Sequence, residues 1–161
     1  MGYDTNFNGE FKLNKPADEG LKLILDGLAT TRRMARKVDE EIYGIEGEFY
    51  FNHDGFFGQT KEDNIIDHNK PPRTQPGLWC QWELQDDNVT IRWDGSEKFY
   101  CYTEWIKYII ERVLKPRGYT LNGVVYWDGE DRTDFGKIEI IDNIVNVYNG
   151  VRQYRKRGGT E

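Results

Sequence analysis

Cysteine and histidine are scarce in this sequence, which limits the chemistry that it can support. Of its 161 residues, two are Cys and two are His. Cys80 and Cys101 belong to no CxxC pair, and no His lies at metal-ligand spacing from either of them. The count gives no disulfide framework and is typical of a protein of the reducing cytoplasm. Cys80 lies between Trp79 and Trp82 in a strand-like run, so we expect a core thiol rather than a nucleophile.

Long apolar runs and the common ligand-binding motifs are also missing. No run of about 18 apolar residues occurs, so no segment is expected to span a membrane. The beginning of the sequence lacks the apolar core of a signal peptide, and Asn6 occupies the position at which a myristoylation motif has Ser or Thr. The sequence has no Walker A, GxGxxG, GxSxG or HExxH motif. We therefore expect no cofactor, and we favour a binding protein over an enzyme.

Positive charge is in short supply over most of the chain. The formal net charge is −6, yet residues 152–161 hold four basic residues and one acidic residue, a net +3, which leaves −9 on residues 1–151. An acidic body argues against binding to the nucleic-acid backbone over a broad face, since that requires many Lys and Arg side chains. It is compatible with solubility or with a partner that has a basic surface. We expect the basic tail, residues 152–161, to be a frayed end.

Aromatic residues are abundant instead. They make up 14% of the chain, although the hydrophobic fraction is only 37%. Each buried ring removes roughly 150–250 Å² from water, so these residues supply much of the expected core. The length fits one domain, which we place at residues 1–151.

Hydrophobic periodicity predicts the order of the strands and helices. Alternation in residues 3–13 predicts a half-buried strand, and Leu21, Leu25 and Leu28 mark the buried face of a helix within residues 14–37. Residues 39–76 contain few signals of regular structure. After them, the pattern predicts a strand at 78–84, a hairpin partner at 89–93, a helix from a Ser96 N-cap to Lys115, and three closing strands within GVVYW, GKIEII and NIVNVY.

This order predicts an α+β fold with an antiparallel or mixed sheet of roughly 5–6 strands. Two helices separated by a hairpin are expected to pack on one face of such a sheet. We expect a ferredoxin-like βαββαβ core with an added hairpin. Residues 39–76 would then be an irregular insertion.

Carboxylates crowd into the run YWDGEDRTDFGKIEI at residues 126–140. The run does not fit an EF-hand loop, which requires acids at alternate positions followed by Gly and then Glu at fixed places. Three interpretations remain, namely a solvated hairpin turn, a hard-cation site and a loop that binds a partner. Arg132 and Lys137 would partly neutralise a cation site. We therefore predict no metal, and we assign a partner-binding role to Asp128, Glu130, Asp131 and Asp134.

Both histidines, His53 and His68, lie in the irregular stretch 39–76. With nearby carboxylates they could hold Zn²⁺ or serve as the acid and base of a metal-dependent hydrolase. No compact ligand motif supports that chemistry, so positions in surface turns are the simpler interpretation.

A ligand pocket is predicted beside the strand at 78–84. This strand has aromatic or apolar residues on both faces, and some of them must face away from the helices. If the insertion folds over that open face, it forms a pocket in which rings and arginines can hold a base or a phosphate. The alternative is that the insertion simply covers an apolar sheet face. The candidate ligand-binding residues are Arg32, Arg33, Arg73, Trp79 and Gln81.

Three segments of the sequence carry a resemblance. They are MGYDTNFNGEF, the stretch from NKPPRTQPGLWCQWEL to WDGSEKFYCYTEWIKYII, and LKPRGYTLNGVVYWDGEDRTDFGKIEIIDN. Together they resemble a family of small bacteriophage-encoded proteins to which no activity is assigned. The resemblance implies a protein that acts in the cytoplasm of a bacterial host, and it implies no catalytic residue.

The sequence therefore favours a protein that acts by binding. Our first hypothesis is a phage accessory protein that inhibits or modulates a host or anti-phage defence protein. The alternative is a binder of a nucleotide or signalling small molecule in the aromatic and Arg-lined pocket. A metal-dependent hydrolase is the third class.

Overall fold

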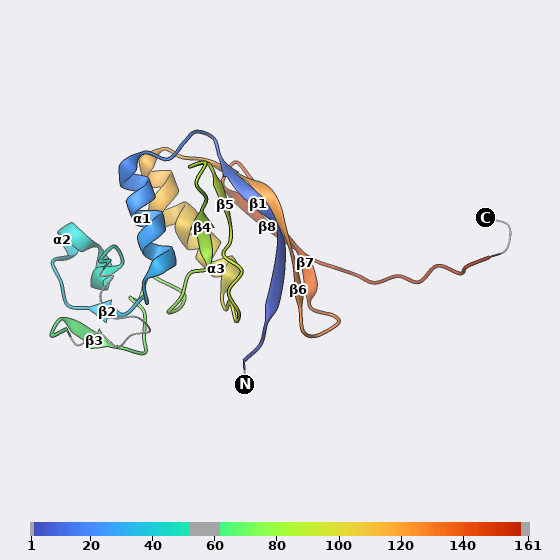
Figure 1. Cartoon of the computed structure of the whole chain (residues 1–161), viewed down its shortest axis with the longest axis horizontal. Helices are drawn as coiled ribbons and strands as arrows, with labels where there is room; N and C mark the ends of the chain where they lie inside the picture. Colours follow the sequence, from blue (N-terminus) through green and yellow to red (C-terminus); the bar gives the residue numbers. More distant parts are fainter. Residues whose placement is uncertain (1, 52–61, 159–161) are drawn as a thin grey trace.

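The computed structural model describes residues 2–51 and 62–158, which build one large antiparallel sheet and a layer of helices. The large sheet has six strands in the order β4-β5-β1-β6-β7-β8, and a second, two-stranded sheet joins β2 to β3 (Figure 1). The strands are β1 (Thr5–Leu13), β2 (Ala35–Arg36), β3 (Ile65–Asp67), β4 (Trp82–Leu84), β5 (Thr90–Trp93), β6 (Leu121–Gly129), β7 (Phe135–Ile141) and β8 (Ile144–Asn149). The helices are α1 (Glu19–Thr30), α2 (Glu40–Tyr43), η1 (Ile45–Gly47), α3 (Tyr102–Tyr108), η3 (Ile109–Leu114) and η4 (Lys115–Arg117).

The strands are connected as in a ferredoxin-like core. In chain order, β1, α1, β4, β5, α3 and β6 form a βαββαβ unit, and its strands lie side by side in the order β4-β5-β1-β6. All neighbouring pairs in this sheet are antiparallel. The hairpin β7–β8 extends the sheet beyond β6. The predicted α+β fold, with a ferredoxin-like core and an added hairpin, is confirmed.

The two main helices lie on one face of the sheet (Figure 1). The register of β1 places Phe7 opposite Trp127 and Leu13 opposite Leu121, so these side chains share the helix-facing side. Alternating residues, such as Lys12, point to the other side, and no helix among the described elements covers this outer face. The sheet therefore has one covered and one open face.

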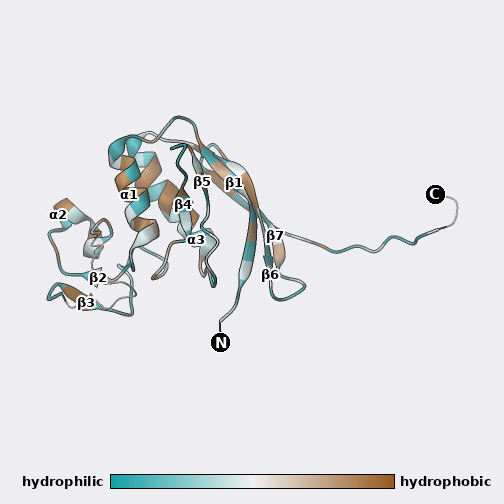
Figure 2. Cartoon of the chain, in the orientation of Figure 1, coloured by the Kyte–Doolittle hydropathy of each residue, from teal (hydrophilic) through white to brown (hydrophobic). Residues whose placement is uncertain are grey.

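The sequence accounts for helix α1 by its N-cap residue and by the spacing of its leucines. Asp18 is the N-cap, because its side chain accepts a hydrogen bond from the backbone N–H of Leu21. Leu21, Leu25 and Leu28 are buried against the sheet, whereas Glu19 and Lys22 are exposed on the remaining face together with Leu23 (Figure 2).

The second long helix begins later than predicted. Ser96 is not its N-cap, since the Ser96 N–H donates to Asp94 Oδ1 in a turn, and α3 starts at Tyr102. Phe99 is nevertheless buried, because its ring packs edge-on against Trp82 in the loop before the helix. The helix continues through the π-helical η3 into η4 and ends at Gly118, which has the left-handed conformation. Its buried residues are Trp105, Ile106, Tyr108, Ile109, Ile110, Val113 and Leu114.

Two glycines let β1 and β6 approach closely. Gly9 has a φ of +108° and Gly123 has a φ of +143°. A Cβ atom on Gly9 would lie 2.4 Å from the carbonyl oxygen of Val124, and one on Gly123 would lie 2.4 Å from that of Glu10. Only glycine fits such contacts without moving a neighbouring strand.

The long connection, which we define as residues 31–77, does not cover the open face of the sheet with its described residues, 31–51 and 62–77. Its described part packs against the helices, because Glu48 bonds to Tyr108 of α3 and Arg112 of η3. The expected covering of the outer face is therefore wrong for residues 39–51 and 62–76, and residues 52–61 lie outside the described part of the chain. The reason is that this segment carries buried polar groups, whose partners lie on the helices.

The strand predicted at 78–84 is shorter in the structure. Only Trp82–Leu84 pairs as β4, since the Leu78 carbonyl accepts a hydrogen bond from the Arg33 N–H of the long connection instead. Within the described ranges, no helix is both long and apolar enough to cross a membrane.

Candidate functional site

Arg33 is the most completely bonded charged residue of the long connection. Its side chain is buried, and all five of its N–H groups donate hydrogen bonds. Burial lowers the pKa of Arg33 to about 10, so the guanidinium stays charged at neutral pH. The acceptors are Gln75 Oε1 (3.2 Å), Thr31 Oγ1 (2.6 Å) and the carbonyl oxygens of Tyr50 (3.2 Å), Gly47 (3.0 Å) and Glu48 (3.0 Å).

Glu48 lies beside Arg33 and joins the long connection to the second helix. Its buried carboxylate accepts hydrogen bonds from Tyr108 (2.9 Å), from Thr74 (3.1 Å) and from both Nε and Nη2 of Arg112. Burial alone would raise the pKa of Glu48, but the hydrogen bonds from Arg112, the Ile45 N–H and Tyr108 outweigh it, so the pKa lies below its ordinary value. This Arg33–Glu48 network fastens the connection to the fold, and its polar groups are occupied by protein partners.

Three of the five predicted ligand residues lie together in the structure. Arg32, Trp79 and Gln81 line a hollow of about 350 Å³, and the guanidinium carbon of Arg32 lies 5.9 Å from the centre of the Trp79 ring. Asp94 and Glu97, which the sequence did not indicate, form part of the same wall. The hollow is therefore lined by a cation, an indole and two carboxylates.

The other two predicted ligand residues lie elsewhere. Arg33 is enclosed in the Arg33–Glu48 network, and Arg73 pairs with Glu46 at 3.6 Å on the surface of the long connection. Within the hollow, Gln81 is also engaged, because its Nε2 donates to the Glu97 carbonyl and its Oε1 accepts from Trp93 Nε1. Arg32 donates to the His68 carbonyl and to Asn69 Oδ1.

The acidic turn between β6 and β7 is tied to the start of the chain. Asp134 accepts hydrogen bonds from the Tyr3 hydroxyl (2.7 Å) and from Trp127 Nε1 (2.9 Å). The Asp131 N–H donates to the Tyr3 hydroxyl oxygen, and Glu130 accepts from the Asp4 N–H. The carboxylates of Glu130 and Asp134 thus face the β1 side of the turn, that of Asp131 accepts from Thr133 within the turn, and Asp128 is exposed on β6. These contacts hold the N-terminal segment against the turn.

Metal and thiol chemistry find little support in the described part of the chain. No group of three or more His, Cys, Asp or Glu side chains within residues 2–51 and 62–158 is arranged to hold a metal ion. His53 lies outside the described residues, and His68 is exposed beside β3. Burial raises the pKa of Cys80 to about 12, and burial followed by Glu104 also raises that of Cys101. Neither thiol is therefore activated.

Strand β8 forms an open edge of the large sheet. No strand of the described residues pairs with its outer side, and its sequence, IVNVYN, contains no charged residue. Ile144, Val147 and Tyr148 are exposed by 65%, 44% and 47%. Strand edges are usually protected by charge, proline or shortness, and β8 has none of these features. The opposite edge, β4, has three residues and contains Glu83.

The backbone groups on this edge can be assigned from the register. The Gly150 N–H donates to the Phe135 carbonyl, so residue 150 points toward β7. Because hydrogen-bonded and non-bonded positions alternate in an antiparallel pair, Val145, Val147 and Asn149 direct their N–H and C=O groups outward. The edge therefore offers a row of unpaired donors and acceptors.

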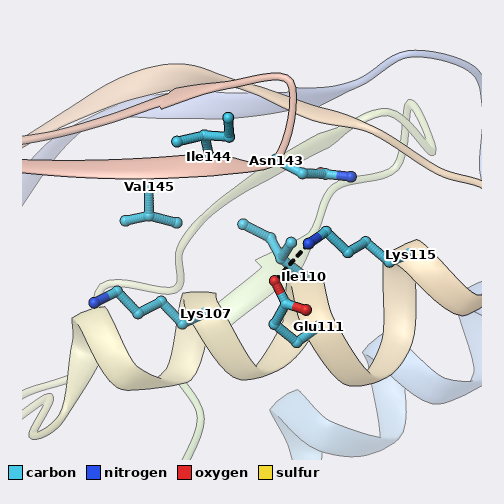
Figure 3. Close-up of a pocket in the computed structure, with 7 residues that line it drawn as sticks. All are labelled: Lys107, Ile110, Glu111, Lys115, Asn143, Ile144 and Val145. Carbon is cyan, nitrogen blue, oxygen red and sulfur yellow. Dashed lines mark hydrogen bonds and ion pairs between the residues drawn. The ribbon is translucent and has the colours of Figure 1, made fainter.

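A groove of about 300 Å³ lies beside β8 on the helix-facing side of the sheet (Figure 3). Two helices cover the four core strands, but the added hairpin projects beyond them, which leaves space between η3 and β8. Val145 points toward the helix, and Ile144 points to the opposite side of the strand. Lys107 and Lys115 border the groove, and Lys115 pairs with Glu111 at 2.7 Å.

Beyond β8, residues 150–158 leave the body as an extended arm (Figure 1). The arm is exposed and carries Arg152, Arg155, Lys156 and Arg157, with Tyr154 among them. At its base, Arg152 lies 4.3 Å from the centre of the Phe135 ring and donates to the Arg132 carbonyl. The tail predicted to be a frayed end thus starts with defined contacts on the β8 side of the acidic turn.

No family model matches this sequence, and neither a curated protein nor a solved structure gives a match.

Proposed function

We propose that the protein acts by binding another protein, which adds an extended segment to the free edge of β8. The observation that carries this proposal is the combination of six uncharged strand residues with exposed apolar side chains on both faces. A partner strand would satisfy the outward N–H and C=O groups of Val145, Val147 and Asn149, and its side chains would meet Val147 on one face and Tyr148 on the other.

The surroundings of β8 support an interaction surface at this place. The groove lies on one side of the strand, and the arm and the acidic turn lie at its end. Exposed apolar residues continue along this edge from Ile141 to Tyr154. The predicted partner-binding residues Asp128, Glu130, Asp131 and Asp134 would lie at the periphery of this surface, with Glu130 and Asp134 turned toward β1, so their charges would affect the association rate more than the affinity.

The resemblance to phage proteins suggests where to look for the partner. Under the proposal, the partner is a protein of a bacterial host or of its anti-phage defence, and binding inhibits or modulates it in the cytoplasm. Strand addition suits this role, because backbone hydrogen bonds give affinity without requiring a preformed pocket.

Replacement of Val147 by Pro tests the proposal. Proline removes the outward N–H and leaves the hydrogen bonds between β7 and β8 intact, since residue 147 does not donate to β7. Val147→Thr is the matched control, because it keeps both the N–H and the β-branched shape. The wild-type protein and the two variants are used for affinity capture from bacterial lysate, and thermal melting confirms that each is folded. Proteins captured by the wild type and by Val147→Thr should be lost with Val147→Pro; equal capture by all three would contradict the proposal.

A second candidate function is supported by the hollow at Trp79. Three predicted ligand residues from two segments line it, and Arg32 and Trp79 provide a charged and a stacking surface for a nucleotide-like molecule. Asp94 and Glu97 would oppose a highly charged phosphate, so a ligand with both charges fits better. Calorimetric titration with nucleotides and with zwitterionic nucleoside derivatives tests this function. Binding that is lost in Trp79→Ala would support it, and binding that persists in that variant would contradict it.

A further inference from the structure

We infer that the segment which pairs with β8 is acidic, and that Lys137 on the outer face and the cations of the arm hold its carboxylates. This inference rests on the proposed function and adds the chemistry of the partner to it. It is drawn from the distribution of charge around β8, which differs from that of the whole chain.

The chain as a whole is acidic, but the region around β8 is rich in cations. Lys107 and Lys115 border the groove, and Lys137 lies 5.1 Å from the centre of the Tyr148 ring on the outer face. The arm begins directly after the strand and adds Arg152, Arg155, Lys156 and Arg157.

The nearby carboxylates offset only part of this charge. Glu111 neutralises Lys115 in an ion pair, and the acids of the β7–β8 hairpin are Glu139 and Asp142. The acidic turn lies next to the base of the arm, yet its bonds with Tyr3 and the Asp4 N–H place Glu130 and Asp134 on the β1 side. Positive charge therefore dominates along the free edge and the arm.

A second copy of the chain would not supply these carboxylates. Strand β8 contains no charged residue, so in a pairing of two β8 strands neither strand would place an acidic side chain beside Lys137. An acidic segment from a different protein supplies such side chains and gains attraction to the arm.

The groove adds a requirement for one apolar side chain. Its floor is formed by Ile110 and Val145. A partner strand on β8 would alternate its side chains between the two faces, so every second residue would point toward the groove side. The best partner segment therefore alternates apolar and acidic residues.

Synthetic peptides test this inference directly. The probes are three fluorescent peptides of equal length that alternate valine with glutamate, with lysine or with serine, and their binding to the full chain is followed by anisotropy. The glutamate peptide should bind about tenfold more tightly than the serine peptide, as a few exposed ion pairs would provide. The difference should shrink at about 0.5 M salt, where such pairs are screened. Equal binding of all three peptides, preference for lysine, or no binding of the glutamate peptide would overturn the inference.

Two triple charge variants and Val147→Pro show which residues cause the preference for the glutamate peptide. Replacing Arg155, Lys156 and Arg157 by Gln should remove most of the preference for glutamate, whereas replacing the exposed Lys22, Lys37 and Lys70 by Gln changes the net charge equally and should preserve it. Val147→Pro should weaken all the peptides. If Val147→Pro loses its captured proteins but the peptides show no charge preference, the acidic partner is refuted while the proposed function stands. If light scattering shows that the wild type is a dimer and that Val147→Pro is a monomer, self-association at β8 would refute the acidic partner.

Discussion

The fully buried carboxylate of Glu48 forms an ion pair with Arg112, which lies at the protein surface on η3. This pair joins a long connection of little regular structure to the second helix of a ferredoxin-like core. The neighbouring side chain of Arg33 binds three carbonyl oxygens of the same connection. Together they hold in place a segment that buries few apolar groups.

The stability of the protein should therefore depend on Glu48 in a pH-dependent manner. The pKa of Glu48 lies below its ordinary value of 4.5. A carboxyl whose pKa is lower in the folded state stabilises the fold above the unfolded pKa, and this contribution is lost as the pH falls through the folded pKa. Glu48→Gln should lower the free energy of unfolding at pH 7 by about 1.5–3 kcal/mol, as loss of hydrogen bonds to a charged group does.

The difference between the wild type and Glu48→Gln should shrink below a pH of about 4.5, where the wild-type carboxyl also becomes protonated. Urea unfolding at several pH values measures it. Glu111→Gln is the control, because Glu111 is exposed in its pair with Lys115 and should contribute about 0–1 kcal/mol at any pH. A constant difference between wild type and Glu48→Gln from neutral to acidic pH would contradict this role.

Arg33 should be required for the fold of the long connection. Arg33→Met removes five donors and leaves the carbonyl oxygens of Gly47, Glu48 and Tyr50 buried without them, which should cost about 3–5 kcal/mol. Limited proteolysis should then cut first within residues 31–77. Arg92→Met, on the exposed outer face of β5, should change stability by less than about 0.5 kcal/mol. Equal resistance of both variants to protease would be inconsistent with the network.

The close approach of β1 and β6 should make Gly123 sensitive to substitution. Gly123→Ala places a Cβ 2.4 Å from the Glu10 carbonyl oxygen, and Gly95→Ala places one in open space at a similarly positive φ of +86°. Gly123→Ala should therefore destabilise the protein by about 1–3 kcal/mol more than Gly95→Ala. Thermal melting of the two variants separates the clash from the backbone strain that they share.

The architecture could be predicted from the sequence because its strands and helices are amphipathic. Alternation in β1, the leucine spacing of α1 and the turn at Asp142 and Asn143 each follow local rules. The βαββαβ order then restricted the arrangement of the sheet. Local rules failed at Ser96, where a turn and the packing of Phe99 against Trp82 replaced the expected first turn of the helix.

The candidate sites were less accessible to sequence reasoning. Arg32 and Arg33 are adjacent in sequence, yet one lines the hollow and the other is enclosed by carbonyl oxygens that come from tertiary folding. The strand that became β8 was predicted, but its position at the edge of the sheet depends on which strands lie beside it. The signal that could have indicated it is the uncharged IVNVYN followed directly by a basic tail.

Amide hydrogen exchange, followed residue by residue in β8, tests the account most directly. In the free protein, the amides of Ile144, Asn146 and Tyr148 should be protected by β7, and those of Val145, Val147 and Asn149 should exchange rapidly. Addition of a captured partner, or of the valine–glutamate peptide, should slow exchange at the three outward amides. Rapid exchange that persists at Val145, Val147 and Asn149 in the bound state would show that the partner binds elsewhere and would contradict strand addition.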